Sequence, residues 1–347
     1  MRDLRIEYED NQYIDVQIED YLFFLGGHNK WKRKIVRSLK RFSLSKSLNE
    51  LESVIYGDDG IGIALDNKEL KIRQIKMLVL EDNSSIYNEL SYSKGNLMYE
   101  ELQSWQDNLV IAHQMEYLND ELIKLEVILN QEMKRFSDSV SSEMIPIIFS
   151  DILKNHLKLM YQSNRKNYPL EMMNSSELLD EYLTLIRHFI KREEKPVWLV
   201  IVNPESFLEA KDLVYLFESL KKIAAESKQL KCLIFSNQSL PLNYTIDDVG
   251  KTVLLYDDYQ QMPIFDNFKE SIERHYPDEL ILSDQELVES FFRINHLIGL
   301  GNQKNRYLKS KDIVLLKVIS KLLNVDFSIE TSVDSLTNLE EAFLNDD

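Results

Sequence analysis

The chain has 347 residues, of which 44% are hydrophobic and 29% are charged. This length and apolar content are enough for a substantial core, and they predict two domains or one domain with large insertions. No apolar run approaches the roughly 20 residues that a membrane span needs, and no early stretch has the pattern of a secretory leader. We therefore expect a cytoplasmic protein with no membrane partner. The single cysteine, Cys232, excludes an internal disulfide framework.

The net charge of −17 argues against a nucleic-acid partner when it is averaged over the chain, but the charge is unevenly distributed. Residues 28–41 carry no acidic side chain and seven basic ones, namely Lys30, Lys32, Arg33, Lys34, Arg37, Lys40 and Arg41. The rest of the chain therefore carries −24 (−17 minus 7). A concentrated basic surface on an acidic body can select one face for a polyanion, and the alternative is an ordinary solvated helix face.

The first elements in chain order indicate strands followed by a helix. Residues 4–9 and 13–18 alternate between apolar and polar side chains, which is typical of half-buried antiparallel strands, and residues 21–25 form an apolar run that predicts a buried strand. A glycine pair, Gly26 and Gly27, follows. Helical spacing then aligns an apolar stripe of Trp31, Ile35, Leu39 and Phe42 beside a cationic stripe of Lys30, Lys34, Arg37 and Arg41.

The pattern becomes helical from about Asn96. Apolar residues recur at alternating spacings of four and three, as in Met115, Leu118, Leu122, Leu125 and Leu129. This repeat predicts a long helix of about 40 residues that packs along a neighbour. Further helices are expected at 147–161 and 177–191. We therefore predict that residues 96–194 form a helical insertion.

Strand character returns at residues 197–202, a continuous apolar run of the length of a buried parallel strand. A helical pattern near 213–220 separates it from further strand candidates at 231–237 and 251–258. Strand, helix and strand with short connections are typical of a parallel sheet. Residues 1–95 and 195–262 are therefore expected to form a split α/β head.

After Pro263 the chain is expected to be helical to its end. The predicted helices cover residues 265–276, 285–298, 312–323 and 336–344. We therefore assign residues 263–347 to a separate, all-helical C-terminal extension. The predicted fold class is α/β, with this extension and the helical insertion added to the head.

The glycine pair after the buried strand resembles the start of a phosphate-binding loop. A working loop needs Gly, four spacers, Gly-Lys and then Ser or Thr: the glycines let backbone amides wrap the phosphates and the hydroxyl holds magnesium. Counted from Gly26, the second glycine position is Trp31, the lysine position is Lys32 and the hydroxyl position is Arg33. Two of the four essential residues are therefore present.

Two further positions needed for nucleotide chemistry are also changed. The strand 197–202 ends at Asn203, where a metal-orienting carboxylate is expected, and the next strand ends at Asn237, where many ATP-binding heads have a histidine. Gly26, Lys32, Asn203 and Asn237 thus define a degenerate nucleotide site. We expect an ATPase-like head without catalytic activity, no required cofactor and no ATP.

The metal ligands, if there are any, are unknown from the sequence. The six histidines are scattered without the paired spacing of a zinc helix and without a cysteine partner. No nucleophile elbow of the Gly-x-Ser-x-Gly type is present either.

Taken in order, the degenerate loop, the helical insertion, the stretch from Trp198 to Asp212 and the strand after it resemble one known family. The chain is similar to the large form of the accessory adaptation protein of type II-A CRISPR systems (Csn family). The resemblance covers roughly residues 1–260, and residues 263–347 would be the extension that distinguishes the large form.

This resemblance implies a degenerate head related to ATPases of the ABC and chromosome-maintenance type. It also implies a ring-shaped homotetramer that takes double-stranded DNA, preferably at ends, without catalysis. The family acts in spacer acquisition and antiviral defence beside the CRISPR integrase proteins and the RNA-guided nuclease. Calcium supports the ring in some shorter members, but residues 161–182 of this chain are less acidic than that role would need.

A basic channel would bind the DNA backbone by displacing counterions, without reading sequence. The predicted DNA-binding residues are Lys30, Lys32, Arg33, Lys34, Arg37 and Arg41, with Lys154 and Lys158 as a second pair one helical turn apart. A third basic cluster lies in residues 303–311. Solvated faces are the alternative for the last two groups.

Two other functions remain open on the sequence alone. One is a nucleotide-switched ATPase acting on DNA, in which Lys32 binds phosphate without the usual metal ligands. The other is a scaffold protein without DNA binding, which joins other adaptation proteins through the long helix and the acidic tail.

Overall fold

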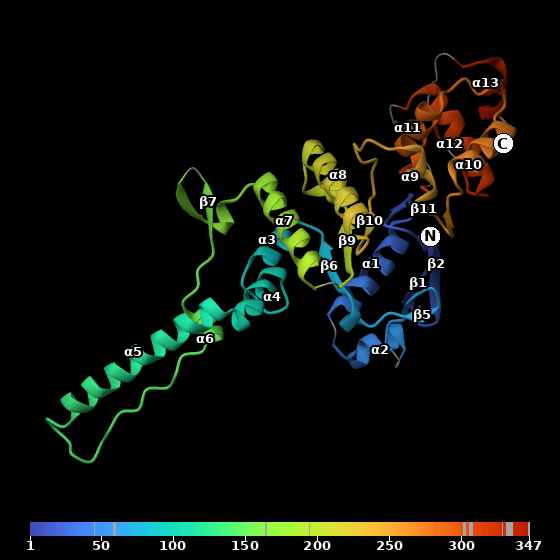
Figure 1. The fold of residues 1–347 in the computed structure, drawn as a ribbon. Helices are drawn as coiled ribbons and strands as arrows, with labels where there is room; N and C mark the ends of the chain where they lie inside the picture. The colour runs from blue at the N-terminus through green and yellow to red at the C-terminus, as the bar shows by residue number, and fades with distance from the viewer. Residues whose placement is uncertain are drawn as a thin grey trace. The chain divides into compact units, whose positions relative to one another are not determined.

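The structure is a computed structural model that describes residues 1–44, 46–57, 60–163, 165–193, 195–300, 303–304, 308–327, 329–330 and 336–345. The chain divides into two compact units (Figure 1). Unit 1 comprises Met1–Asp82 and Ile190–Asp347, and unit 2 comprises Asn83–Phe189. None of the described helices combines the length and the apolar character needed to cross a membrane.

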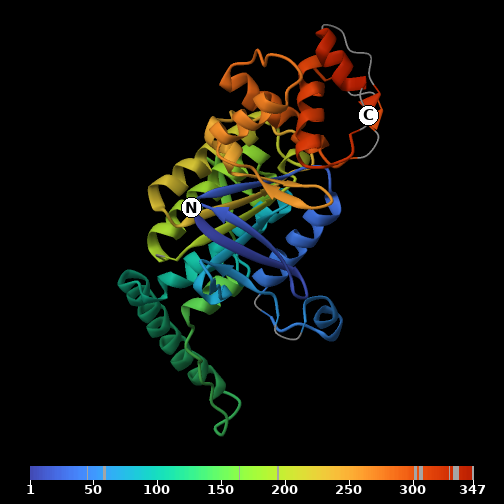
Figure 2. The ribbon, with the colours of Figure 1, turned by 90° about the vertical axis from the view of Figure 1, so that its right-hand side faces the viewer.

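Unit 1 begins with a four-stranded antiparallel sheet in the order β2-β1-β4-β5. Its strands are β1 (Arg2–Glu9), β2 (Gln12–Ile18), β4 (Ile63–Leu65) and β5 (Lys68–Glu69). The first two pair with Ile6 opposite Ile14, and Figure 2 shows them in blue at the start of the chain. Their alternating pattern buries one face and leaves most of the other exposed, with Glu7 of β1 as a buried exception.

The second sheet of unit 1 has six strands in the order β12-β11-β3-β10-β9-β6. Its strands are β3 (Tyr21–Leu25), β6 (Lys76–Leu80), β9 (Val197–Val202), β10 (Leu230–Phe235), β11 (Thr252–Leu255) and β12 (Tyr259–Gln261). All neighbours run parallel except the edge strand β12, which runs antiparallel to β11. The chain therefore returns to this sheet after the insertion, as the split head predicted.

The helix after the glycine pair, α1 (Asn29–Ser43), packs against both sheets. Its Ile35 and Leu39 are fully buried in one core cluster with Ile6 of β1 and Phe24 of β3. The basic residues of α1 are consequently confined to what remains of its surface. A short helix, α2 (Glu50–Tyr56), follows it with a capping box at its start.

The remaining helices of unit 1 lie between or after the strands β9 to β12 in the chain. They are α8 (Ala210–Ser227), α9 (Ile246–Gly250), α10 (Phe265–His275), α11 (Asp284–Ile294), α12 (Ser310–Leu322) and α13 (Asn338–Asn345). The last four are the C-terminal helices, coloured orange to red in Figure 2, and two short strands accompany them, β13 (Gln303–Lys304) and β14 (Ile329–Glu330). The ring of Phe292 in α11 stacks on Tyr244 at 3.6 Å, so the extension packs on the head.

Unit 2 consists of helices and one hairpin. Its elements are α3 (Asn83–Leu90), α4 (Leu97–Gln103), α5 (Leu109–Met133), α6 (Phe149–Asn155), β7 (Met160–Ser163), β8 (Lys166–Pro169) and α7 (Ser175–Glu193), which leads back into unit 1. An extended segment returns along α5, where the amide of Asn119 bonds the backbone of Ile147 and that of Asn130 bonds Ser142.

Two predictions for this region were wrong. The expected helix of about 40 residues is interrupted, because Asn108 caps a new helix by accepting bonds from Val110 and Ile111. The helix predicted at 147–161 ends at Asn155, and the chain continues into the β7–β8 hairpin, so this region is not all-helical.

Candidate functional site

The glycine loop after β3 is very short, because β3 ends at Leu25 and α1 begins at Asn29. Its backbone donors are bonded to the protein itself. The amide of Gly27 donates to the carbonyl of Ile298 at 2.7 Å, and the amide of His28 donates to the carbonyl of Leu255 at 3.2 Å. These are the groups that a phosphate-binding loop would aim at its ligand.

The two glycines are required by packing rather than by a ligand. Gly26 has φ +101°, and a Cβ there would lie 2.3 Å from the carbonyl oxygen of Leu255. A Cβ on Gly27 would lie 2.4 Å from Cγ of Leu300. A segment of the C-terminal extension therefore closes over this loop.

Lys32 is the buried cation of the site. Only 4% of the residue is exposed, and its ammonium donates to the carbonyl of Ser236 and, at 3.1 Å, to Oδ1 of Asn237. Burial lowers the pKa of Lys32 to about 8, against a smaller opposing effect of Glu205. Lys32 was predicted to bind DNA together with its neighbours, but it is buried and so does not belong to the exposed basic surface of α1.

Three of the four residues of the degenerate nucleotide site meet at one pocket. Lys32, Asn203 and Asn237 line a cavity of about 400 Å³ at the carboxyl ends of β9 and β10. Asn203 adopts the left-handed conformation, with φ 47° and ψ 54°, where the chain leaves β9. Gly26 does not line this cavity.

Sequence reasoning missed two participants at these strand ends. The carbonyl of Ser236 holds the ammonium of Lys32, and Oε1 of Glu205 accepts from the backbone of Asn237 at 3.1 Å. Oε2 of Glu205 is buried and has no hydrogen-bond partner among the described residues. Both residues follow a buried parallel strand, and side chains at the carboxyl ends of such strands are the ones to inspect.

The basic surface of α1 is partly neutralised. Four of its cations form ion pairs with carboxylates: Lys34 and Arg37 with Glu9, Lys40 with Glu81, and Arg41 with Glu52. Lys30 and Arg33 are exposed and form no ion pair within the described part of the chain. The side chain of Arg41 is only 10% exposed.

The other predicted cations lie elsewhere. In unit 2, Lys154 is in the last turn of α6 and Lys158 is in the irregular segment after it, so the two are exposed but do not share a helix as predicted. In the third cluster, Arg306 lies outside the described residues, Lys309 is exposed and Lys311 bonds Glu340 at 2.5 Å.

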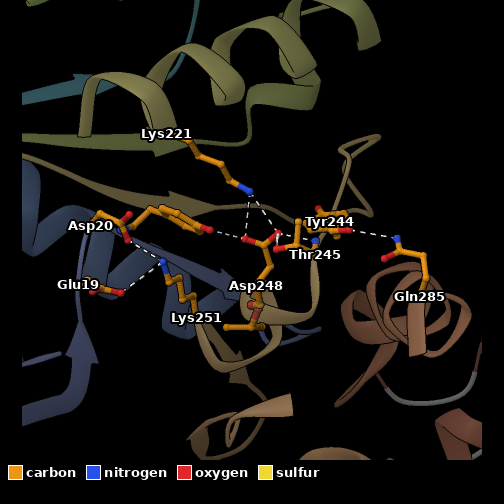
Figure 3. Close-up of polar contacts among 10 residues, drawn as sticks. Glu19, Asp20, Lys221, Tyr244, Thr245, Asp248, Lys251 and Gln285 are labelled. Carbon is orange, nitrogen blue, oxygen red and sulfur yellow. Dashed lines mark hydrogen bonds and ion pairs between the residues drawn. The ribbon is translucent and has the colours of Figure 1, made fainter. Parts of the chain in front are cut away.

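The opposite end of the parallel sheet holds a second polar cluster (Figure 3). Asp248 is fully buried and accepts from the hydroxyl of Tyr21 at 2.6 Å, from Lys221 at 3.1 Å and from the amide of Thr245 at 2.7 Å. Lys251 pairs with Asp20 beside it at 2.8 Å. Every charge in this cluster has a charged partner, so the cluster braces the head.

No group of three or more His, Cys, Asp or Glu side chains that could hold a metal ion occurs among the described residues. The expectation of calcium therefore has no ligand set to support it here and stays a prediction. Cys232 is a free, buried thiol whose pKa is raised by burial.

The fold class predicted from the sequence is confirmed: the chain is a mixed α/β protein with C-terminal helices. It is similar over its whole length to Stu0660 of Streptococcus thermophilus, with a TM-score of 0.83, 16% sequence identity, and 99% of each chain covered. At this identity the likeness concerns the fold alone.

Other solved structures match more weakly. An SMC head bound to the C-winged helix domain of ScpA has a TM-score of 0.41 at 10% identity, covering 77% of this chain and 98% of that one. An ATP-binding cassette of an ABC transporter has a TM-score of 0.33 at 13% identity, covering 69% and 82%. We conclude nothing about this chain from TM-scores this low. No protein-family model and no curated protein matches the sequence.

Proposed function

We propose that this chain is a large-form accessory adaptation protein of type II-A CRISPR systems. In this proposal it binds double-stranded DNA at ends, without sequence preference and without catalysis, as a ring-shaped homo-oligomer. It acts in spacer acquisition beside the integrase proteins and the RNA-guided nuclease. The sequence resemblance supports the family, and the whole-length likeness to Stu0660 agrees with it in fold.

One observation carries the non-catalytic part of the proposal. The amides of Gly27 and His28 already donate to carbonyls of Ile298 and Leu255. A nucleoside triphosphate would have to break these bonds and displace the segment that closes the loop. Arg33 stands where a magnesium-binding hydroxyl is needed, so the usual metal ligand is missing as well. This disfavours the alternative of a nucleotide-switched ATPase.

The DNA-binding part rests on the exposed cations of α1. Seven basic residues occupy positions 28–41, and three carboxylates, Glu9, Glu52 and Glu81, pair with four of them, so the local charge is +4 (7 minus 3). Lys30, Arg33 and Arg37 are the exposed members of this set. Such side chains bind phosphates by releasing counterions, and multiple copies in a ring would add their contributions.

Self-association is supported by α5, a 25-residue helix with no buried residue. Its apolar repeat of Met115, Leu118, Leu122, Leu125 and Leu129, which we call the α5 seam, is half-buried to exposed, and Leu125 is 43% exposed. A seam with alternating spacings of three and four is the surface that one helix offers to another. In the proposal, a second copy of this chain covers it.

The proposed DNA binding is tested by neutralising the exposed α1 cations. We expect a Lys30→Gln, Arg33→Gln, Arg37→Gln variant to lose most affinity for linear duplex DNA. The slope of log affinity against log salt should become shallower by about 0.9 for each phosphate that the variant no longer neutralises. Fluorescence anisotropy at several salt concentrations, on linear and closed-circular DNA, measures both quantities.

A matched control removes three exposed cations from another part of unit 1, in the variant Lys68→Gln, Lys71→Gln, Arg73→Gln. If this control weakens binding as much as the α1 variant does, net charge rather than the α1 surface is responsible. Equal binding of wild type and α1 variant, or no binding by either, would favour the scaffold function.

The proposed self-association is tested on the α5 seam. We expect Leu118→Glu with Leu125→Glu to reduce the oligomer to a smaller species, because the charges would enter an apolar interface, while thermal stability of the chain changes little. Light scattering coupled to size exclusion measures the mass. His113→Glu with Gln131→Glu adds two charges on the opposite side of α5 and should leave the mass unchanged.

A further inference from the structure

The cavity at the carboxyl ends of β9 and β10, which we call the strand-end pocket, shares Arg33 and Arg37 with the proposed DNA surface but also contains a buried cation and apolar residues that this surface lacks. It lies entirely within unit 1 and measures about 400 Å³. Its charged lining residues are Lys32, Arg33, Arg37, Lys40 and Glu81, which gives a net charge of +3 (4 minus 1). Volumes of this order suit a small organic ligand.

The lining of this pocket includes a buried cation that has no counter-ion among the described residues. Lys32 is 4% exposed, and both of its hydrogen-bond acceptors, the carbonyl of Ser236 and the side-chain oxygen of Asn237, are neutral. It forms no ion pair in the described part of the chain; the carboxylate of Glu205 acts on it only at longer range. An ammonium has three donor hydrogens, so one remains for a ligand. Burying an unpaired cation costs several kcal/mol or more, and a bound anion would offset that.

A second cation stands at the rim of the pocket. Arg33 is exposed and has no carboxylate partner among the described residues, whereas Lys40 is paired with Glu81. Arginine presents several donors in a planar fork that suits phosphate oxygens. Lys32 and Arg33 both line the pocket, so an anion bound there can contact both.

The rest of the lining suits a group attached to that anion. Three amide side chains, Asn29, Asn203 and Asn237, offer donors and acceptors, and three apolar residues, Val36, Val202 and Phe235, provide a nonpolar surface. The volume exceeds what a bare phosphate would fill. A di- or triphosphate is disfavoured, because the loop amides that would hold further phosphates are bonded to Ile298 and Leu255.

We propose that the strand-end pocket binds a nucleoside 5′-monophosphate group, with its phosphate contacting Lys32 and Arg33 and its nucleoside against Val36, Val202 and Phe235. The group can be a free mononucleotide or the 5′-phosphorylated end of a DNA strand. Only the second source rests on the proposed DNA-end function.

The first experiment uses the full chain and no DNA. Isothermal titration calorimetry at constant ionic strength measures binding of AMP and dAMP, with adenosine as the uncharged control. We expect the monophosphates to bind and adenosine not to bind. Lys32→Met should weaken binding at least about 10-fold and Arg33→Gln about 3- to 10-fold, as expected for the loss of charge-assisted hydrogen bonds.

The matched control is Lys68→Gln, which removes an exposed cation of unit 1 from outside both the pocket and the proposed DNA surface, and it should leave the affinity unchanged. Because Lys32→Met could disturb folding, its thermal unfolding is measured in parallel, and the exposed Arg33 provides a variant that cannot fail for that reason. Failure of AMP and dAMP to bind, or equal affinities of wild type, Lys32→Met and Arg33→Gln, would overturn the proposal.

The second experiment separates the two sources. Blunt duplexes with 5′-phosphate or 5′-hydroxyl ends are compared on wild type and on Lys32→Met. A preference for phosphorylated ends that Lys32→Met abolishes assigns the pocket to DNA ends. Mononucleotide binding without such a preference assigns it to free nucleotides and supports the pocket proposal. Absence of DNA binding alongside mononucleotide binding contradicts the proposed function and leaves the pocket supported.

Discussion

The two ends of the parallel sheet in unit 1 treat a buried charge in opposite ways. At the amino ends of the strands, Asp248 is fully buried and receives hydrogen bonds from a hydroxyl, a backbone amide and the ammonium of Lys221 (Figure 3). At the carboxyl ends, Lys32 is nearly as buried but has two neutral acceptors and no ion pair in the part of the chain that the structure describes.

This difference distinguishes a charge that stabilises the fold from a charge that can bind a ligand. A buried charge whose hydrogen-bonding capacity is filled by the protein fixes the packing around it. A buried charge beside a cavity, with a donor left over, keeps an unfavourable energy that a ligand of opposite sign can relieve. The amino end therefore stabilises the head, whereas the carboxyl end is the place to look for a ligand.

The largest effect on the free energy of unfolding is expected from removing the buried carboxylate of Asp248. Asp248→Ala leaves the hydroxyl of the buried Tyr21 and the ammonium of Lys221 without their acceptor. We expect the free energy of unfolding to fall by about 3 kcal/mol, because a buried hydroxyl, a backbone amide and a partly exposed ammonium all lose the carboxylate that accepts from them. Urea denaturation measures it.

The neighbouring Asp247 is exposed and supplies the control for this change. Asp247→Ala alters the same helix by the same number of atoms, and it should cost less than about 1 kcal/mol. Similar losses for both variants would mean that the Asp248 cluster contributes no more than a surface charge.

A smaller, pH-dependent effect on the free energy of unfolding is expected at Lys32, at the carboxyl ends of the strands. The pKa of Lys32 is lowered by burial to about 8, so between pH 8 and pH 10 the unfolded chain binds this proton more tightly than the folded one. The contribution of Lys32 to the free energy of unfolding therefore rises with pH through this window. By pH 10 this rise amounts to about 2 kcal/mol.

Lys32→Met removes this contribution. The free energy of unfolding of wild type minus that of Lys32→Met should increase by about 2 kcal/mol between pH 7.5 and pH 10. Taking the difference cancels the titration of the other lysines and tyrosines. Matched urea denaturation series at each pH provide it. A difference that stays constant with pH would show that the Lys32 ammonium is not destabilised by burial.

Much of the head could be predicted from the sequence because its signals are local. The alternation in residues 4–9, the apolar run 21–25 and the helical stripe around Ile35 each reflect which side of one element meets the core. The breaks in the middle of the chain were missed, because the cap at Asn108 and the hairpin at 160–169 interrupt an apolar repeat that continues past them.

The candidate site was predictable only in part. The sequence located Lys32 by its position in the degenerate phosphate loop, and Asn203 and Asn237 by the ends of two apolar strands; the structure brings all three to one cavity. The closure of the glycine loop by Ile298 was not predictable, because residues about 270 positions apart meet through tertiary packing alone. The pairing of Lys34 and Arg41 with Glu9 and Glu52 was hidden for the same reason.

The smallest effect on the free energy of unfolding is expected at Arg33, and comparing it with Arg37 tests which of the two stabilises the fold and which binds a ligand. Arg33 has no protein partner among the described residues, whereas Arg37 donates to the hydroxyl of Tyr56 at 3.0 Å and lies 3.6 Å from Glu9. Arg33→Gln should change the free energy of unfolding by less than about 0.5 kcal/mol, and Arg37→Gln should lower it by roughly 0.5 to 1 kcal/mol.

Urea denaturation without ligand and then with excess AMP distinguishes these roles. A residue that only braces the fold changes the first measurement and leaves the gain from ligand unaltered. A residue that binds does the reverse, because a ligand stabilises the folded state in proportion to the logarithm of its affinity. Arg33→Gln should therefore reduce the stabilisation by AMP while leaving the ligand-free protein as stable as wild type. The opposite result would place Arg33 with the structural cations of α1.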